Sequence, residues 1–335
     1  MAAGKHKPLT LTGCNSIWWH NRARANGCEP VPTGARARWV LWVVACLACL
    51  PCATLAVARP AAAEFSGLVS LADGEPFTLL RGDSAQTGTA GVTLVSGDIL
   101  ETRPGNFLVI EVRGGSLLAI GPDSEVYFLP RAEITTLVVL KGWVKADVRA
   151  TSKASALRIL ATRLGVQVQK AVVLLHADAR SDAIFAEEGS GTLLLRDDAA
   201  THIDKEIQAN QFLVREHEQT VVWKPRPSAD FVANMPVPFR DPLPANASVK
   251  LKKAVEPNLV REVSYSDVQP WLTMPRDWRA GFIPRFRARL EDQAFFTAMD
   301  AHLHQHPEWT VILHPPPPPE TDAGNLRLSA QKKPQ

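Results

Sequence analysis

The feature that most constrains this chain is a series of short apolar runs that begins after residue 64. Residues 107–112, 116–120 and 125–129 are three consecutive examples, and glycine or proline follows each of them within two positions. Such runs, recurring about every ten residues, are typical of strands joined by tight turns. The pattern predicts a mainly β fold, with many short strands in a sandwich or a short solenoid.

The same pattern continues to about Trp223. The further runs are 135–140, 143–148, 158–162, 166–169, 172–177, 183–187, 192–196, 212–215 and 220–223. We expect each of these runs to form a short strand, because each is rich in branched apolar residues and is bounded by polar or turn-forming ones.

The N-terminal region has the three parts of an export signal. Arg36 and Arg38 precede an apolar stretch that runs from Trp39 to Ala58, and a run of three alanines ends at Ala63. A basic flank, an apolar core and an A-x-A site define a secretory signal peptide. We therefore expect cleavage after Ala63 and a periplasmic mature chain.

Two alternatives to cleavage stay open. The stretch from Trp39 to Ala58 has 20 residues, which is long enough to remain as an inner-membrane anchor with the arginines on the cytoplasmic side. The sequence around Cys46 also loosely fits a lipoprotein cleavage box. The membrane would then be contacted only through this N-terminal segment.

The charge and the cysteines also separate this region from the rest. The first 63 residues hold seven lysines and arginines against one acid, so 30 basic and 33 acidic residues remain beyond Ala63. The basic isoelectric point is thus a property of the leader, and it does not indicate nucleic-acid binding. All 5 cysteines precede residue 53. Cys46, Cys49 and Cys52 have metal-cluster spacing, but their apolar surroundings favour small buried side chains over a thiolate cluster.

Several short motifs resemble those of a FecR-type domain, over residues 67 to about 226. The most specific motif is Gly-Asp-Ile-Leu-Glu-Thr at 97–102, and Gly-Ser-Leu-Leu-Ala-Ile-Gly-Pro-Asp-Ser follows at 115–124. Weaker matches are 140–144, 187–189 and 207–211. The resemblance implies a β-rich periplasmic sensor domain. It marks seven residues as turn-forming positions of the family signature: Gly97, Asp98, Leu100, Thr102, Gly115, Ser116 and Gly142.

The chain also departs from that family's pattern. The expected Gly-Thr step is absent from residues 168–173. Only 35 residues precede Arg36, which is too few for the cytoplasmic helical domain with which family members regulate sigma factors. The resemblance therefore supports the periplasmic β module and not the whole signalling relay.

The chain changes character after Trp223, and composition suggests five segments. They are an N-terminal extension with signal peptide or anchor (1–63), a FecR-like β domain (64–226), a proline-rich extended linker (227–262), a helical segment (263–314) and a disordered proline-rich tail (315–335). Within the helical segment we expect one helix over 276–289, which Pro284 would kink or end, and an amphipathic helix over 293–303. The arginines of the first helix could form a basic surface, but a solvated face behind buried aromatics is the simpler interpretation.

No residue pattern indicates catalysis. There is no nucleophile elbow, P-loop or dinucleotide fingerprint, and adjacent acids such as Asp197 and Asp198 point to opposite faces of a strand. His302 and His306 have the spacing of metal ligands on a helix, although a solvated helix end explains them more simply. We expect no enzyme activity, no cofactor and no metal.

The sequence thus favours an exported FecR-like binding or scaffolding protein of the cell envelope, linked to envelope signalling through contact with another envelope protein. Strand addition to an exposed sheet edge is the expected mode of contact. The alternative is a peptidoglycan- or glycan-binding accessory protein, because residues 95–100 also resemble the start of a LysM repeat. The two strands that follow fit a LysM unit poorly, since that unit needs helices there.

Overall fold

The computed structural model describes residues 66–112, 114–130, 134–149, 156–197, 200–216, 219–245, 247–251 and 253–317. The expected signal peptide, cleavage site, anchor and cysteines, and nearly all of the tail, lie outside the described residues. Within the described ranges, no helix is long and apolar enough to cross a membrane. Contacts group the chain into two units, Met1–Ala58 and Arg59–Gln335, and every described residue belongs to the second.

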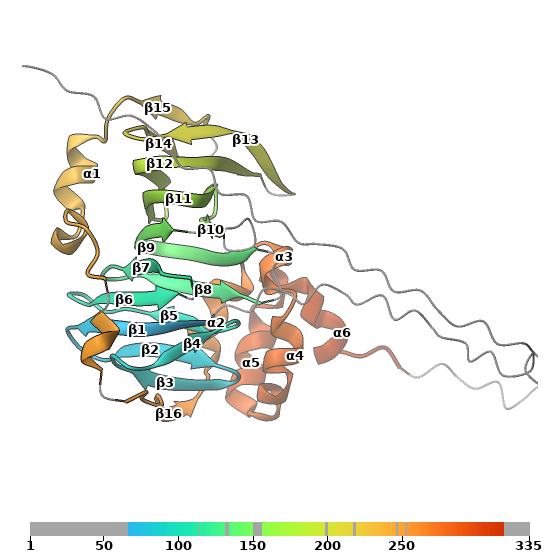
Figure 1. Ribbon diagram of the computed structural model, residues 1–335. Helices are drawn as coiled ribbons and strands as arrows, with labels where there is room; N and C mark the ends of the chain where they lie inside the picture. The colour runs from blue at the N-terminus through green and yellow to red at the C-terminus, as the bar shows by residue number, and fades with distance from the viewer. Residues whose placement is uncertain are drawn as a thin grey trace, which may run out of the picture. The chain divides into compact units, whose positions relative to one another are not determined.

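Sixteen strands pair into one sheet, and Figure 1 shows them stacked from β15 at one end to β16 at the other. They are β1 (Ser66–Asp73), β2 (Phe77–Arg81), β3 (Ser84–Gly88), β4 (Thr93–Val95), β5 (Ile99–Glu101), β6 (Phe107–Val112), β7 (Ser116–Ile120), β8 (Glu125–Leu129), β9 (Thr135–Arg149), β10 (Leu157–Leu160), β11 (Leu164–Ala177), β12 (Ser181–Asp197), β13 (Ala200–Gln208), β14 (Phe212–Glu216), β15 (Val222–Lys224) and β16 (Asn258–Glu262). The predicted mainly β fold with a small helical C-terminal part is confirmed.

Three long strands divide this sheet into two layers. β9 pairs with β8 and β10 through its first half and with β7 through its second half. β11 pairs first with β10 and then with β9, while β12 pairs with β14 near its start and with β13 near its end. One layer therefore contains β1, β4, β6, β7, β14 and β15, and the other contains β2, β3, β5, β8, β10, β13 and β16.

The long strands pass from one layer to the other at bends. In β9 the bend contains Gly142, whose φ is +97°, and in β12 it contains Gly189, whose φ is +73°. In β11 the register shifts between Val168 and Lys170. Glycine adopts positive φ without the steric penalty that a Cβ brings, and a bulge bends a strand in a similar way. Each long strand therefore replaces two of the separate strands expected from the sequence.

Alternating side chains build three apolar clusters. The largest lies between the layers and takes one face of nearly every strand, from Val69 in β1 to Leu213 in β14. The outer face of the β8-containing layer forms a second cluster around Tyr127 and Val138. The outer face of the β7-containing layer forms a third, around Leu117 and Trp143. Both outer faces are thus apolar, and both need a cover.

The C-terminal helices cover the β8-containing layer (Figure 1). They are α2 (Tyr265–Leu272), α3 (Arg276–Arg279), α4 (Phe282–Phe286), η4 (Arg287–Glu291), α5 (Gln293–Ala301), η5 (Leu303–Gln305), η6 (Pro307–Trp309) and α6 (Thr310–Leu313). The single helix expected over 276–289 is three short helical pieces, broken at Gly281 and continued beyond Pro284. Its aromatic residues Trp278, Phe282 and Phe286 are buried on the sheet, as the simpler of the two interpretations expected. The arginine face that this interpretation expected to be solvated is only partly so, because Arg289 is buried and Arg279 and Arg285 are half-buried.

The segment 227–262 covers the other layer and differs from the extended linker expected from its prolines. It forms α1 (Ala229–Asn234), η2 (Val237–Phe239) and η3 (Ala247–Lys250) before β16. Phe231 and Phe239 are buried in the third cluster. Prolines here begin and end short helical turns, and the apolar residues between them have a sheet face on which to pack. The segment is therefore part of the folded body.

Candidate binding surface

The Gly-Asp turn of the family signature is an internal structural element. Gly97 has a φ of +94° in the turn between β4 and β5, and Asp98 next to it is buried. The Asp98 carboxylate accepts hydrogen bonds from Arg81 Nε at 2.9 Å, from Arg81 Nη2 at 2.6 Å and from the Val95 N–H at 2.9 Å. A two-pronged guanidinium pair of this kind is strong and geometrically specific. The aspartate therefore fixes the turn and is not presented to a ligand.

Thr102 and Gly142 of the signature belong to a second internal cluster. Thr102 Oγ1 donates to the Gly121 carbonyl at 2.7 Å and accepts the Ser124 N–H at 2.8 Å. Ser124 Oγ accepts the Trp143 N–H at 2.9 Å, beside Gly142, where a Cβ would overlap that hydroxyl. These bonds tie the end of β5 to the bend in β9.

The last three signature residues are also structural. Leu100 is buried in the central cluster. Gly115 has a φ of +83° in the β6–β7 turn, and Ser116 Oγ accepts the Arg149 N–H at 3.2 Å. The structure thus places the seven signature residues in turns, in the bend of β9 or in the core, at several places and not in one site.

Arg285 of α4 connects the C-terminal helices to the Gly-Asp turn. Its Nη1 donates to the Gly97 carbonyl at 2.6 Å, its Nη2 to the Leu80 carbonyl at 2.9 Å and its Nε to the Gly82 carbonyl at 2.6 Å. Burial lowers the pKa of Arg285 and raises the pKa of nearby Tyr127 to about 12. The sequence placed Arg285 among the arginines of a solvated helix face, and this is wrong for Arg285 because its guanidinium binds backbone carbonyls, which a sequence pattern cannot identify.

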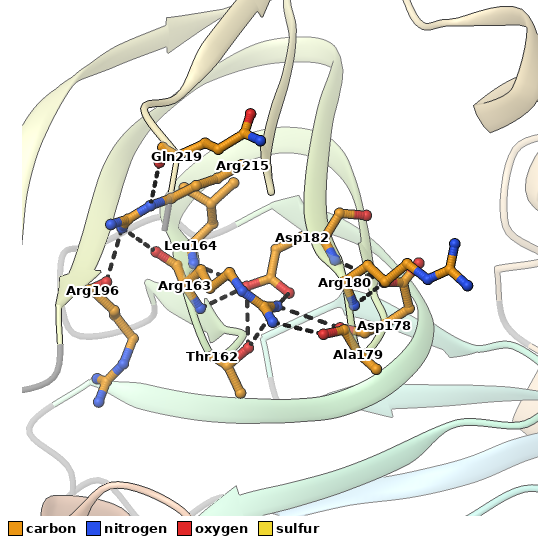
Figure 2. Close-up of polar contacts among 11 residues, drawn as sticks. Thr162, Arg163, Leu164, Asp178, Ala179, Arg180, Asp182, Arg196, Arg215 and Gln219 are labelled. Carbon is orange, nitrogen blue, oxygen red and sulfur yellow. Dashed lines mark hydrogen bonds and ion pairs between the residues drawn. The ribbon is translucent and has the colours of Figure 1, made fainter. Parts of the chain in front are cut away.

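A polar cluster fixes the turns at one end of β10 to β14 (Figure 2). At its centre Asp182 is fully buried and accepts the Arg163 N–H at 2.6 Å, the Leu164 N–H at 3.1 Å and Arg163 Nη1 at 3.2 Å. Burial raises the pKa of Asp182, and the N–H groups and guanidinium of Arg163 act against that rise. Asp178 accepts the Arg180 N–H at 2.6 Å in the next turn.

Arg215 extends this cluster to the β12–β13 hairpin. Its Nη1 donates to the carbonyls of Arg163 at 3.1 Å and Arg196 at 2.8 Å, and its Nη2 donates to Asp197 Oδ1 at 3.0 Å (Figure 2 shows the two carbonyl bonds). Arg196 stacks on the Trp278 ring at 4.1 Å, and burial lowers its pKa. The partners of these arginines are groups of this chain, so the cluster holds the hairpin rigidly rather than offering a free anion site.

Among the described residues, four strands pair on one side only: β4 with β1, β13 with β12, β15 with β14 and β16 with β3. Of these, β13 and β16 carry the most exposed large apolar side chains. Both strands expose large apolar side chains: Ile203 in β13 is 77% exposed, while Leu259 and Val260 in β16 are 69% and 60% exposed. An edge strand carries a row of unpaired N–H and C=O groups, which makes it a template for another strand. These edges are the candidate binding surface.

A cavity of about 330 Å³ lies between β14 and α1. The rings of Trp143 and Phe231 lie 4.9 Å apart in its wall, and those of Phe212 and Phe231 lie 4.8 Å apart. Glu216 and Asp230 add carboxylates to the lining. Aromatic walls with a few polar groups suit a small organic ligand.

The C-terminal histidines do not form a metal site in the part of the chain that is described. No group of three or more histidine, cysteine or acidic side chains there could hold a metal ion. His306 is fully buried and its Nε2 lies 3.2 Å from the Met299 carbonyl, whereas His302 stacks on the Tyr265 ring. The solvated helix end favoured from the sequence is therefore wrong for His306.

No family model matches this chain, and no curated protein matches it. Two crystal structures, at 1.65 and 2.50 Å resolution, are similar to it, each of a protein described as a "putative anti-sigma factor" from Parabacteroides distasonis ATCC 8503. They are 11% and 10% identical to it, with TM-scores of 0.34 and 0.33, and the matches cover 40% of this chain. The chain spans 62% of the length of each.

A likeness at this level carries no argument about what the chain binds. The function has to be argued from the surfaces described above.

Proposed function

We propose that this chain is a binding or scaffolding module of the bacterial cell envelope, which recognises a partner protein by adding a strand of that partner to an open edge of its sheet. The observation that carries the proposal is that β13 and β16, two of the four one-sided edge strands among the described residues, carry the most exposed apolar side chains and lie at opposite ends of one layer. In strand addition, main-chain hydrogen bonds supply affinity and flanking side chains supply specificity. The buried polar clusters give that layer a rigid frame.

The experiment compares three variants of the full chain in its bacterial host. Ile203→Lys and Leu259→Lys each place a charge on one edge strand, and Val311→Lys is the control because Val311 on α6 is 66% exposed and apolar but belongs to no sheet edge. Each chain carries the same photo-crosslinker at an exposed position next to the edge strand under test. We expect one protein adduct to disappear with an edge variant and to persist with Val311→Lys. Adducts that are unchanged in both edge variants contradict strand addition.

Export is the second part of the proposal, and it rests on the residues from Arg36 to Ala63. Cell fractionation with sequencing of the mature N-terminus tests it. A periplasmic species that begins at Glu64 supports a diffusible binding module. A membrane-retained species that still contains Trp39 to Ala58 supports an anchored one, and a full-length cytoplasmic species contradicts both.

Glycan binding is a second candidate, and the cavity beside α1 is the observation that favours it. Aromatic rings that pack on sugar faces and carboxylates that accept hydroxyl hydrogen bonds are the groups that a carbohydrate site needs. We would sediment the full chain with purified peptidoglycan. If this candidate is correct, Glu216→Gln combined with Asp230→Asn abolishes co-sedimentation and Ile203→Lys leaves it intact. Absence of co-sedimentation excludes this candidate for peptidoglycan.

A further inference from the structure

The end of β16 meets a cavity with acidic walls. Glu262, the last residue of the strand, lines a cavity of about 500 Å³ together with Asp83 from the β2–β3 turn and with Glu291 and Asp292 from the end of η4. Arg289 is the one basic side chain among the lining residues. Four carboxylates and one guanidinium leave an excess of three negative charges in this cavity.

The charge of Arg289 is already committed to its own neighbours. Its Nε donates to the Val263 carbonyl at 3.0 Å, its Nη2 pairs with Asp292 at 2.7 Å, and its Nη1 pairs with Glu262. Asp83 and Glu291 make no ion pair among the described residues. The Asp83 carboxylate accepts a 3.4 Å hydrogen bond from the adjacent Ser84 hydroxyl, and it interacts electrostatically with Arg285 without contacting it as an ion pair. Two carboxylates therefore stay available to a positively charged group from outside.

The cavity adjoins a strand edge that is open and apolar. All five residues of β16 are exposed, and the register against β3 shifts between Leu259 and Arg261. The shift leaves Val260 without a partner on β3, and such bulges redirect side chains at sheet edges and binding sites. Leu259 and Val260 are 69% and 60% exposed, so an added strand would meet apolar side chains at this edge.

We infer that the outer edge of β16 and this acidic cavity form one binding surface for an extended peptide segment that carries a lysine or arginine. The inference rests on the proposed strand addition and specifies its place and the chemistry of its partner. The added segment pairs with β16 through its backbone and contacts Leu259 and Val260 with apolar side chains. Its basic side chain enters the cavity and meets Asp83 and Glu291.

The geometry sets the spacing within that segment. Because of the bulge, the β3 partners of Leu259 and Glu262 are Gln86 and Ser84, which are only two residues apart. At about 3.3 Å per residue, the positions opposite Leu259 and Glu262 on a paired strand lie about 7 Å apart. The basic residue of the partner therefore lies about two positions from the apolar residue that packs on Leu259. The other open edge, β13, offers no such preference, because its exposed charges include both Lys205 and Glu206.

The test uses the full chain and three synthetic peptides. The first is a ten-residue peptide of alternating threonine and valine with two lysines near one end. In the second, glutamate replaces both lysines, and in the third, two consecutive central amides of the lysine peptide are N-methylated so that neither of its edges can pair. We expect the lysine peptide alone to bind, with an affinity that falls as salt is raised.

Three protein variants locate the peptide. Asp83→Asn combined with Glu291→Gln should weaken binding of the lysine peptide about fivefold, since exposed ion pairs are individually weak. Leu259→Lys should abolish binding. Glu206→Gln, which neutralises an exposed acid on the other edge, should leave it unchanged.

The other outcomes distinguish a failure of this inference from a failure of the proposed strand addition on which it rests. If the double variant binds the lysine peptide as tightly as the parent, the acidic cavity plays no part and the inference fails while strand addition stands. The inference also fails if Ile203→Lys abolishes binding and Leu259→Lys does not, because the edge in use is then β13. Equal binding of the N-methylated peptide overturns the inference and strand addition together.

Discussion

Replacing Lys145 by methionine should detach the segment 229–243 from the sheet and lower the free energy of unfolding by about 3 kcal/mol. Lys145 lies in β9 and is only 2% exposed. Its Nζ donates to the Phe239 carbonyl at 2.8 Å and the Asp241 carbonyl at 3.1 Å, and it pairs with a Glu187 carboxylate oxygen at 2.7 Å. The ammonium therefore joins one strand of the sheet to the segment that covers it.

The magnitude follows from what methionine leaves behind. The Phe239 carbonyl loses its partner in a buried position, and an unsatisfied buried acceptor costs about 1–3 kcal/mol. The Asp241 carbonyl and the partly exposed Glu187 carboxylate can each recover water, so they contribute less. Removing the buried ammonium also removes its own desolvation cost, which offsets part of the loss. About 3 kcal/mol corresponds to roughly a hundredfold change in the unfolding equilibrium constant.

Lys141 provides the matched control in the same strand. It is 51% exposed and pairs with Glu125 at 2.8 Å, so Lys141→Met should cost less than about 1 kcal/mol. Circular dichroism during urea denaturation measures the free energy of unfolding of both variants. Limited proteolysis shows whether cleavage within 229–243 increases. If both variants lower the free energy of unfolding by the same small amount, the buried ammonium makes no net contribution to stability and the reasoning is refuted.

Two further predictions concern backbone bends and pH. Gly142→Ala should destabilise the fold by about 3 kcal/mol or more, because the added Cβ meets a positive φ and overlaps Ser124. Gly97→Ala, where the added Cβ has open space, should cost about 1 kcal/mol. Equal losses of the free energy of unfolding in urea melts would show that the overlap at Gly142 is relieved. Burial lowers the pKa of His176 and of His306 below the ordinary value near 6.5, so below that value the unfolded chain takes up protons that the folded chain does not. The free energy of unfolding should therefore fall as the pH drops from about 7.5 to about 5, and His176→Gln combined with His306→Gln should flatten this slope; a stability that rises over that range contradicts the assignment.

The sequence predicted the strands well where one run makes one strand. The runs at 107–112, 116–120 and 125–129 coincide with β6, β7 and β8. It failed where a strand bends between layers. Lys141-Gly142 looks like a turn between two strands, yet β9 continues through it, because glycine permits a sharp bend as readily as a reversal. β11 and β12 were likewise each expected as two separate strands, although each continues through its bend.

The sequence predicted that the binding surface is an exposed sheet edge, but not which strand forms it. An exposed edge was expected from the β pattern, but β16 lies among prolines and charged residues, with no clear strand signal of its own. Its pairing with β3 joins distant parts of the chain, and such long-range partners are not written into local periodicity. Lys145 and Arg285 were missed for the same reason, since what makes them important is a set of carbonyls far away in sequence.

The pairing of β16 with β3 also has a consequence for the order in which the protein is made. β3 ends at Gly88 and its outer neighbour begins at Asn258, which leaves the ribosome 170 residues later. At a synthesis rate of about 5–20 residues per second, about 10–30 s pass between the synthesis of the two strands. In a molecule that folds around β3 during that interval, the β3 edge is an exposed strand edge that the finished protein protects. A chain that is truncated before Asn258 keeps that edge exposed permanently. We expect such a fragment to self-associate.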